Sequence, residues 1–187
     1  MKKAFIGSGI RYDLFDDSPY FDTVVKYHTS GRLKVAPEHT EDRVLKLMRK
    51  PSFELFERLN NRFNTLCRRE GLKYQLIPYF ISSHPGCEES DMRALADKVL
   101  GKLHFNLEQV QDLTPTPMTL SSVMFYMGEN PFTGEKVYVA RSQEDKRRQK
   151  AYFFGGTLPE AERRKGGKPQ KGGGTQRSRG RKFGNKR

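Results

Sequence analysis

The segment that constrains the fold most is an apolar, aromatic run at residues 74–81, followed by a polar turn at residues 82–86. An apolar run of strand length without clean alternation is typical of a strand that is covered on both faces. Pro85 and Gly86 force the chain to turn, and residues 88–100 then carry apolar side chains at helical spacing. The pattern predicts a strand–turn–helix unit, and the ligands of such units usually bind at the turn.

Three further units of this kind are predicted along the chain. Their strands are residues 3–6, 33–35 and 110–113, each followed by a polar turn and then by a helical pattern. This alternation of strands and helices predicts a parallel sheet with right-handed crossovers. About four strands are too few to close a barrel, so we predict an α/β fold that is part of a (βα) barrel.

Local signals within these units make specific predictions. Pro78 interrupts the apolar run, which favours a bulge or an exposed edge over a fully hydrogen-bonded interior position. Thr40 and Ser52 each precede a helical pattern. They are predicted to cap the two helices that follow the second strand.

Charge separates a basic tail from a nearly neutral body. The 187 residues carry a net charge of +13, but 11 of the 35 Lys and Arg residues lie in residues 163–187, where no acidic residue occurs. The other 24 basic residues are balanced by 22 acidic ones. Residues 155–187 are rich in Gly, Lys and Arg, and we predict that they are disordered. The predicted organisation is a barrel-like part at residues 1–128, an appendage at residues 129–154 and the tail.

Cysteine usage and hydropathy exclude several classes of protein. Cys67 and Cys87 cannot make a disulfide framework, which predicts a reduced, cytoplasmic compartment. No apolar run approaches the length of a membrane span, so no membrane partner is expected. The chain has no Gly-rich phosphate loop, and no ligand pair has the spacing of a metal site. We therefore predict no metal-binding residues in this chain.

Polar and ionisable residues gather in the turns directly after the predicted strands. In parallel α/β folds these turns share one edge of the sheet, where ligands usually bind. Because loops are polar in any case, a purely structural role stays open for each residue. Their density predicts a site that includes Ser8, Arg11, Asp13, Glu38, His39, Ser82, Ser83, His84, Gln111, Asp112 and Thr114.

Two other features allow alternative interpretations. Cys87 with His84 could form a nucleophile pair, but the position of Cys87 at a helix start favours a capping or packing role. The Lys and Arg residues of the tail would release counterions from phosphates, which predicts weak, salt-dependent nucleic-acid binding. An RNA-associated binding module is therefore the alternative function. A solubilising role is equally open, because Phe183 is the only aromatic residue of the tail available for stacking.

The four turns resemble motifs of the YgiQ-like branch of the radical S-adenosylmethionine (SAM) enzymes. The matching stretches are SGIRYDL at residues 8–14, LKVAPEH at 33–39, PYFISSHPG at 78–86 and QVQDLTPTP at 109–117. NPFTGEKVYV at residues 130–139 and KRRQ at residues 146–149 continue the resemblance, which spans residues 3–154. The motifs are long and occur in the order of the family.

The resemblance implies a partial (βα)6 barrel that holds a [4Fe-4S] cluster and SAM. In this family three cysteines of a CxxxCxxC loop after the first strand bind the cluster, and reductive cleavage of SAM gives a radical that abstracts hydrogen from a substrate. This chain has no such loop, and its strands resemble the last four of six. The resemblance therefore implies the C-terminal part of a radical SAM enzyme, inactive alone, whose partner is the missing N-terminal barrel segment.

The resemblance also implies roles for individual residues, with a structural role as the alternative for each. The residues expected to contact SAM are Ser8, Glu38, Ser82, Ser83, Thr114 and Pro115, of which the two serines at 82 and 83 face the ribose and the last two approach the adenine. The residues expected to face the substrate or order the pocket are Arg11, His84, Gln111 and Asp112. The resemblance does not supply the identity of the substrate.

Overall fold

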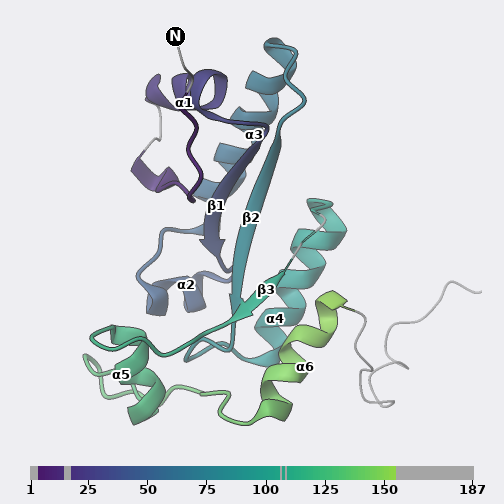
Figure 1. Cartoon of the computed structure of the whole chain (residues 1–187). Coiled ribbons are helices and arrows are strands. Elements are labelled where there is room, and N and C mark those ends of the chain that lie inside the picture. The colour runs from purple at the N-terminus through teal and green to yellow at the C-terminus, as the bar shows by residue number, and fades with distance from the viewer. Residues whose placement is uncertain (1–3, 15–17, 106, 108, 155–187) are drawn as a thin grey trace, which may run out of the picture. The chain divides into compact units, whose positions relative to one another are not determined.

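Three parallel strands form the sheet in the computed structural model, which describes residues 4–14, 18–105, 107 and 109–154. The strands are β1 (Arg32–Glu38), β2 (Gln75–Ser82) and β3 (Val110–Asp112), and β2 lies in the middle (Figure 1). Helices separate the strands in sequence, as parallel neighbours require. The predicted α/β class with a parallel sheet is confirmed, whereas the barrel stays a prediction.

Six α-helices accompany the sheet in the described part of the chain. Ser52 caps α3 as predicted, because its Oγ accepts a hydrogen bond from the backbone N–H of Glu54. The prediction for Thr40 is wrong: its hydroxyl donates to the Glu41 carboxylate, and the Glu41 N–H donates to the ring of His39 instead. The helices are α1 (Tyr20–His28), α2 (Asp42–Met48), α3 (Phe53–Arg69), α4 (Glu89–Ala96), α5 (Leu120–Met127) and α6 (Gln143–Phe154), with a 3-10 turn η1 (Tyr12–Leu14) and a π-helical continuation of α4, η2 (Asp97–Lys102).

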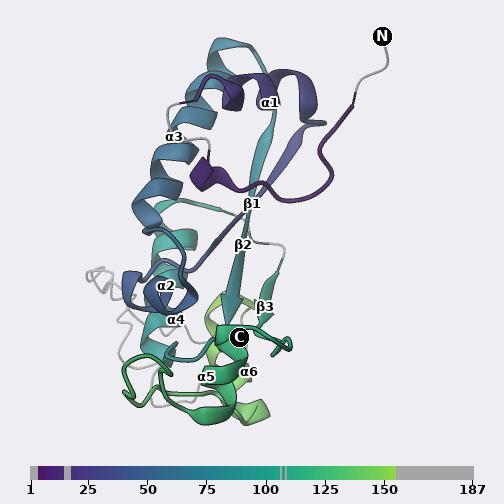
Figure 2. The ribbon, with the colours of Figure 1, turned by 90° about the vertical axis from the view of Figure 1, so that its left-hand side faces the viewer.

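Three of the described helices cover one face of the sheet. Figure 2 shows α2, α3 and α4 on one side of β1 and β2. Burial alternates along β2, and Ile77, Tyr79 and Ile81 on the other face are only half-buried. The prediction of a strand covered on both faces is wrong, because both faces are apolar but α2, α3 and α4 pack on one of them and the other is only half-buried. The strand residues buried in the core on that face are Leu33, Val35, Leu76, Phe80 and Val110.

Pro78 lies just before the position at which the register between β1 and β2 shifts and the pairing of β2 with β3 begins. The C=O of Ser82 accepts a hydrogen bond from Leu113 N–H beyond β3, so Pro78, an even number of residues back, also directs its backbone polar groups to that side. Because β3 pairs only with residues 80–82, the missing N–H of Pro78 costs no ladder hydrogen bond. On the other side, the register of β1 shifts just after the pair Val35–Pro78. The irregularity therefore lies in β1, next to the pair that contains Pro78, and the predicted alternative of an exposed edge is wrong, because β2 is the middle strand.

The first predicted strand does not form in the described residues. The N–H of Ile6 donates to the C=O of His28 at the end of α1, rather than to β1. A single parallel bridge joins Ile10 to Val35. Gly7 and Gly9 favour irregular backbone here, because glycine has no side chain to pack in a strand. The sheet therefore has three strands rather than four in the part that the structure describes, and residues 1–3 lie outside that part.

The described residues all belong to one compact unit, Met1–Thr157. Its core contains Phe56 of α3, which is fully buried and contacts the rings of Tyr12, Phe53 and Phe105. None of the helices in the described ranges combines the length and the apolar character needed to cross a membrane. The predicted disordered tail at residues 155–187 lies outside the described residues.

Candidate functional site

The carboxyl ends of the three strands meet at one edge of the sheet. In the register of the strands, Glu38 pairs with Phe80, and Ser82 pairs with Asp112. Because the strands are parallel, the turns that follow them share this edge. The residues of the predicted site that it brings together are Glu38, Ser82, Ser83, Gln111 and Asp112.

Two residues at this edge adopt a left-handed backbone without being glycine. Glu38 has a φ of 68° at the end of β1, and Ser83 has a φ of 61° just after β2. Each such residue costs about 1 kcal/mol or more, and the conformation persists only where surrounding contacts fix it. Glu38 is held by an ion pair with Lys50 (Nζ–Oε1 3.1 Å). Ser83 is held by its N–H, which donates to Gln149 Oε1 at 2.7 Å.

Beside β1, the loop after Ile10 forms a small charged cavity. Arg11 pairs with Asp13 through two hydrogen bonds of 2.9 and 2.6 Å, which hold the pKa of the Asp13 carboxyl below its usual range. Burial, together with the charges of Asp13 and Glu38, raises the pKa of Tyr12 to about 12. The cavity has a volume of about 320 Å³ and is also lined by Ala36, Arg49 and Lys50. The predicted residue Arg11 therefore borders the same end of β1 as Glu38.

Between β2 and β3, a carboxylate is held by two donors. Ser82 Oγ donates to one Asp112 oxygen at 2.7 Å, and Lys150 of α6 donates to the other at 2.7 Å. Ser82 is fully buried, and Gln111 is exposed. These bonds occupy Ser82 and Asp112 with each other. Gln111 is the predicted residue of this strand whose side chain lies open to solvent.

Ser83 differs from its neighbour in having an unused hydroxyl. Its side chain is buried, and its Oγ has no hydrogen-bond partner among the described residues. A buried hydroxyl without a partner costs about 1–3 kcal/mol. Such a group at the carboxyl edge of a parallel sheet fits a position where a polar ligand atom binds.

Two buried histidines adjoin this turn with fixed tautomers. His84 Nδ1 donates to the C=O of Pro85, so its Nε2 accepts the hydrogen bond from Ser121 Oγ. His39 Nδ1 accepts from Glu41 N–H, so its Nε2–H points at Cys87 Sγ, 3.5 Å away. Burial is the main cause that lowers the pKa of both imidazoles, that of His39 to about 4.

Cys87 lies against His39 and not against His84. Burial raises the pKa of its thiol to about 12, so the sulfur stays protonated and is a poor nucleophile. The packing role that we predicted for Cys87 fits this environment, and the structure does not show the alternative pair with His84. The thiol serves as part of the polar core beneath the turn.

The buried imidazole of His39 makes stability depend on pH. Its pKa is lowered from 6.5 to about 4 in the folded chain, so the unfolded chain binds more protons between these values. Stability is therefore full above about pH 6.5 and falls as the pH falls. We expect the free energy of unfolding to drop by about 2 kcal/mol between about pH 7 and pH 5, measured by urea denaturation.

Two variants check this assignment. His39→Gln removes the imidazole and should flatten most of the pH dependence over this range, apart from the smaller contribution of His84. His104→Gln, at an exposed position, should leave the dependence unchanged. An unchanged pH dependence in the His39→Gln chain would show that another group causes it.

Other predicted residues lie apart from this hydrogen-bonded group. Ser8 is exposed on the irregular segment before Ile10. Thr114 is exposed, and Pro115 is half-buried in the turn after β3. Lys50, from the segment after α2, and Gln149 and Lys150, from α6, were missed at the sequence level, because neither segment carries a local signal for this edge. The one pointer was that Gln149 ends the KRRQ motif.

The described residues do not supply a cluster-binding site. No group of three or more His, Cys, Asp or Glu side chains within the described ranges is arranged to hold a metal ion. Cys67 and Cys87 are both buried in the core. The donor set therefore does not fit an iron–sulfur cluster, and the placement of the cluster ligands outside this chain stays a prediction.

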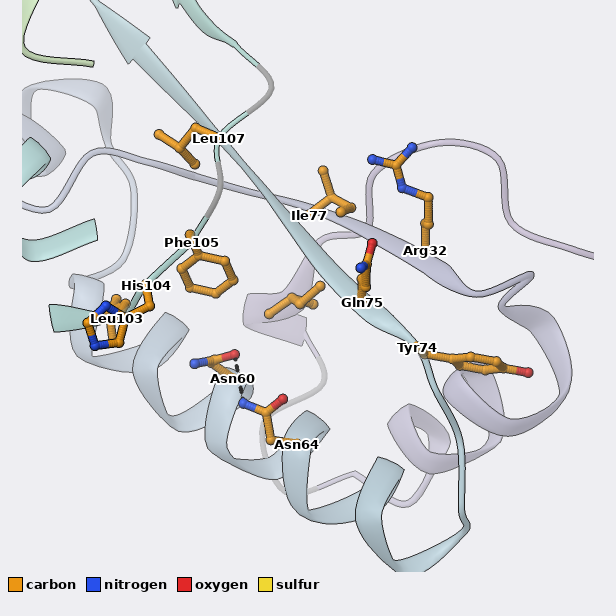
Figure 3. Close-up of a pocket in the computed structure, with 11 residues that line it drawn as sticks. Arg32, Asn60, Asn64, Tyr74, Gln75, Ile77, Leu103, His104, Phe105 and Leu107 are labelled. Carbon is orange, nitrogen blue, oxygen red and sulfur yellow. Dashed lines mark hydrogen bonds between the residues drawn. The ribbon is translucent and has the colours of Figure 1, made fainter. Parts of the chain in front are cut away.

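A separate cavity of about 620 Å³ lies at the opposite, amino-terminal end of β2 (Figure 3). Tyr74, Gln75 and Ile77 line one side of it, and Asn60 and Asn64 of α3, hydrogen-bonded to each other, line another. None of the predicted site residues borders it. Because ligands of parallel sheets bind at the carboxyl ends of the strands, we assign the candidate site to the carboxyl edge.

Comparison with known proteins gives relatives over most of the chain. A family model described as a domain of unknown function (DUF3362) matches residues 108–154. UPF0313 proteins of Bacteroides thetaiotaomicron and Porphyromonas gingivalis are each 52% identical over 165 residues, covering 82% of this chain and 26% of the relative. A UPF0313 protein of Methanocella arvoryzae is 45% identical over 152 residues, covering 81% of this chain and 25% of the relative. No solved structure matches. The chain thus spans about a quarter of the length of these curated relatives.

Proposed function

Because the chain belongs, over the residues that these relatives cover, to the UPF0313 or YgiQ-like family, we propose that it is the SAM- and substrate-facing part of a radical SAM enzyme. In this proposal the sheet is one section of a partial barrel. The rest of the barrel comes from the part of the family-length protein that this chain does not match.

The half-packed sheet supports the barrel. Ile77, Tyr79 and Ile81 of β2 are apolar and only half-buried on the face opposite the helices. A βα barrel has helices outside and packed side chains inside. This face would therefore be the interior of the barrel, completed by further strands.

The carboxyl edge carries the proposal of SAM binding. The observation that supports it best is the pair of left-handed residues Glu38 and Ser83 on adjacent strands, together with the unused, buried hydroxyl of Ser83. Strained residues fixed by surrounding contacts are concentrated at ligand sites. Both residues were expected to contact SAM on the strength of the motifs alone.

Each residue at the edge has a role that its chemistry allows. The Glu38 carboxylate would bind the ammonium of the methionine part of SAM, with Lys50 holding the carboxylate in place. The Ser83 hydroxyl would bond to a ribose hydroxyl, and the backbone at Thr114 and Pro115 would approach the adenine. Gln111, exposed at the end of β3, would face the substrate.

The chain's own residues bind and orient, and the chemistry belongs to the bound groups. SAM next to a reduced iron–sulfur cluster supplies the oxidising power that removes a hydrogen atom from a substrate. The ligands of that cluster would come from the unmatched part of the protein. This chain would fix the position of SAM, and the ion pair of Arg11 and Asp13 would border the substrate side.

Binding of SAM tests the proposal. The material is a complex of this chain, co-expressed with the part of the Bacteroides thetaiotaomicron relative that the match does not cover. Anaerobic calorimetry should show SAM binding that weakens about tenfold in Ser83→Ala, where one hydrogen bond is lost, and about 10–100-fold in Glu38→Gln, where a charged one is lost.

Matched controls separate a local effect from a general one. Ser30→Ala and Glu70→Gln change the same residue types at exposed positions before β1 and β2, at the amino-terminal end of the sheet, and Glu70, like Glu38, is ion-paired with a lysine. Both should bind SAM as the unaltered complex does. Equal affinity in all four variants would contradict the proposed SAM site.

The RNA-associated alternative stays a prediction. Its basis is the basic tail at residues 155–187, which lies outside the described residues. No observation on the described residues favours it over the SAM proposal.

A further inference from the structure

The side chain of Gln149 on α6 joins both ends of the turn that follows β2. Its Oε1 accepts a hydrogen bond from Ser83 N–H at 2.7 Å, and its Nε2 donates to the C=O of Cys87 at 2.8 Å. The side chain is 1% exposed. An amide has one acceptor and one donor group, and here each group meets one end of the turn.

Other contacts from the same C-terminal region hold this turn and its surroundings. The N–H of Gly86 donates to the C=O of Tyr138 at 2.7 Å. Lys150, next to Gln149, binds Asp112 at the end of β3. Tyr152 donates to Glu89 at the start of α4. Residues from the range of the DUF3362 match, 108–154, therefore bind the backbone of the turn at Ser83, Gly86 and Cys87. Residues of α6 also bind side chains at the end of β3 and the start of α4, the two elements beside the turn.

The left-handed conformation of Ser83 depends on this support. The N–H of Ser83 has its hydrogen bond to Gln149, and the buried Oγ has no partner in the described part of the chain. Without Gln149, a buried N–H at a strained residue would lose its acceptor, and the backbone would have reason to relax. The direction of the Ser83 hydroxyl is thus set by a side chain 66 positions away.

We propose that the DUF3362 region is a positioning element, and that Gln149 is the residue through which α6 fixes the turn that carries Ser82, Ser83 and His84. The effect of Gln149 on the conformation of the turn does not depend on any ligand. Its effect on ligand binding rests on the proposed SAM site.

Hydrogen exchange of the chain tests the effect on the turn. In Gln149→Leu, which is similar in size but has no polar group, the amides of Ser83, His84, Gly86 and Cys87 should exchange at least about tenfold faster, while those of α3 stay unchanged. Arg147→Leu on the same helix, with a side chain 78% exposed, should leave both regions unchanged. Unchanged exchange at Ser83 in Gln149→Leu would overturn the proposal.

A second variant keeps the test informative if the leucine variant does not fold. In Gln149→Glu, the ionised carboxylate can still accept the hydrogen bond from Ser83 N–H. It has no hydrogen to donate to the C=O of Cys87, so that hydrogen bond is lost and two oxygens face each other. A protonated carboxyl has one donor and one acceptor, as the amide does. Exchange at Ser83, corrected for its intrinsic pH dependence, should therefore be fast at about pH 8 and return towards the unaltered chain's protection at about pH 5.5, because burial raises a carboxyl pKa.

The titratable groups that contact residue 149 would not by themselves cause this pH-dependent recovery of protection at Ser83. Burial raises the pKa of Cys87 to about 12 and lowers that of His39 to about 4, so both stay neutral over the range tested. The same pH series on the unaltered chain records the contribution of all other groups. An absence of pH-dependent recovery in a folded Gln149→Glu chain would contradict the positioning role. The charged groups near this position are Arg43 of α2, Glu88 directly before α4, Glu89 and Asp91 on α4, Asp112 at the end of β3, and Asp145, Arg148 and Lys150 on α6.

The ligand experiment distinguishes the two proposals. In the co-expressed complex, Gln149→Glu should bind SAM at least about tenfold more weakly than the unaltered complex at about pH 8, with recovery at about pH 5.5. If the unaltered complex binds no SAM while the exchange results hold, the SAM site is wrong and the positioning of the turn stands. If SAM binds and Gln149→Glu alters the turn without altering affinity, the positioning role for this ligand is wrong.

Discussion

Replacing Phe56 with alanine is expected to lower the free energy of unfolding by about 3–5 kcal/mol. The ring is fully buried, and its centroid lies 5.1 Å from that of Phe53, 5.8 Å from that of Phe105 and 6.3 Å from that of Tyr12. Its removal would leave a cavity between α3, the segment before β3 and the turn η1. Because domains of this size are stable by about 5–15 kcal/mol, much of the folded population is at risk. Urea denaturation at neutral pH measures the change.

An exposed phenylalanine provides the matched control. Phe132 is 74% exposed, so the same truncation there should change stability by less than about 0.5 kcal/mol. A loss of under about 1 kcal/mol in Phe56→Ala would show that α3 does not pack on the sheet as described.

The element order was predictable from the sequence, because it depends on local signals. Ser52 shows this best: a hydroxyl directly before an apolar stripe caps α3 as expected. Thr40 presents the same signal but fails, because the neighbouring His39 ring takes the N–H that a cap would have bound. Local patterns cannot reveal such competition from a buried side chain.

Local sequence patterns could not predict the number of strands or which faces of β2 other elements cover. Residues 4–6 have strand-like composition, yet Ile6 bonds to the end of α1. The apolar residues on both faces of β2 predicted two packed faces, but one face is only half-buried in this chain. Composition records which residues avoid water and not which element covers them.

The candidate site was partly predictable for a similar reason. Polar residues after strands indicated the carboxyl edge, and the parallel register brings Ser82 and Asp112 together there. Gln149 and Lys150 could not be found, since they reach the edge from α6 and their partners lie 38 or more positions away in sequence. Lys50 could not be found either, because the segment after α2 carries no local signal for its ion pair with Glu38. The left-handed backbone of Ser83 could not be predicted either, because a serine, unlike a glycine, does not indicate a positive φ.

Co-expression with the unmatched part of the Bacteroides thetaiotaomicron relative is expected to change iron content from essentially none to about four atoms per complex. The reason is that the described residues contain no three-ligand group, whereas a cluster needs cysteine thiolates. Iron and sulfide analysis after anaerobic reconstitution gives the result. The isolated chain, treated identically, is the reference.

Cysteine variants of this chain control for binding by its own thiols. Cys67→Ala with Cys87→Ala should leave the iron content of the complex unchanged, because both side chains are buried in the core. Stoichiometric iron in the isolated chain, lost on replacing these two cysteines, would contradict the assignment of the ligands to the unmatched part.

Hydrogen exchange of the complex with and without SAM tests most directly whether the carboxyl edge of this sheet holds the ligand. Slower exchange on SAM addition is expected at residues 38–39, 82–84 and 111–114, with no change at residues 60–64 or 74–77 around the amino-terminal cavity. Protection confined to the amino-terminal end, or no protection at the carboxyl edge under conditions where calorimetry shows SAM bound, would contradict this placement.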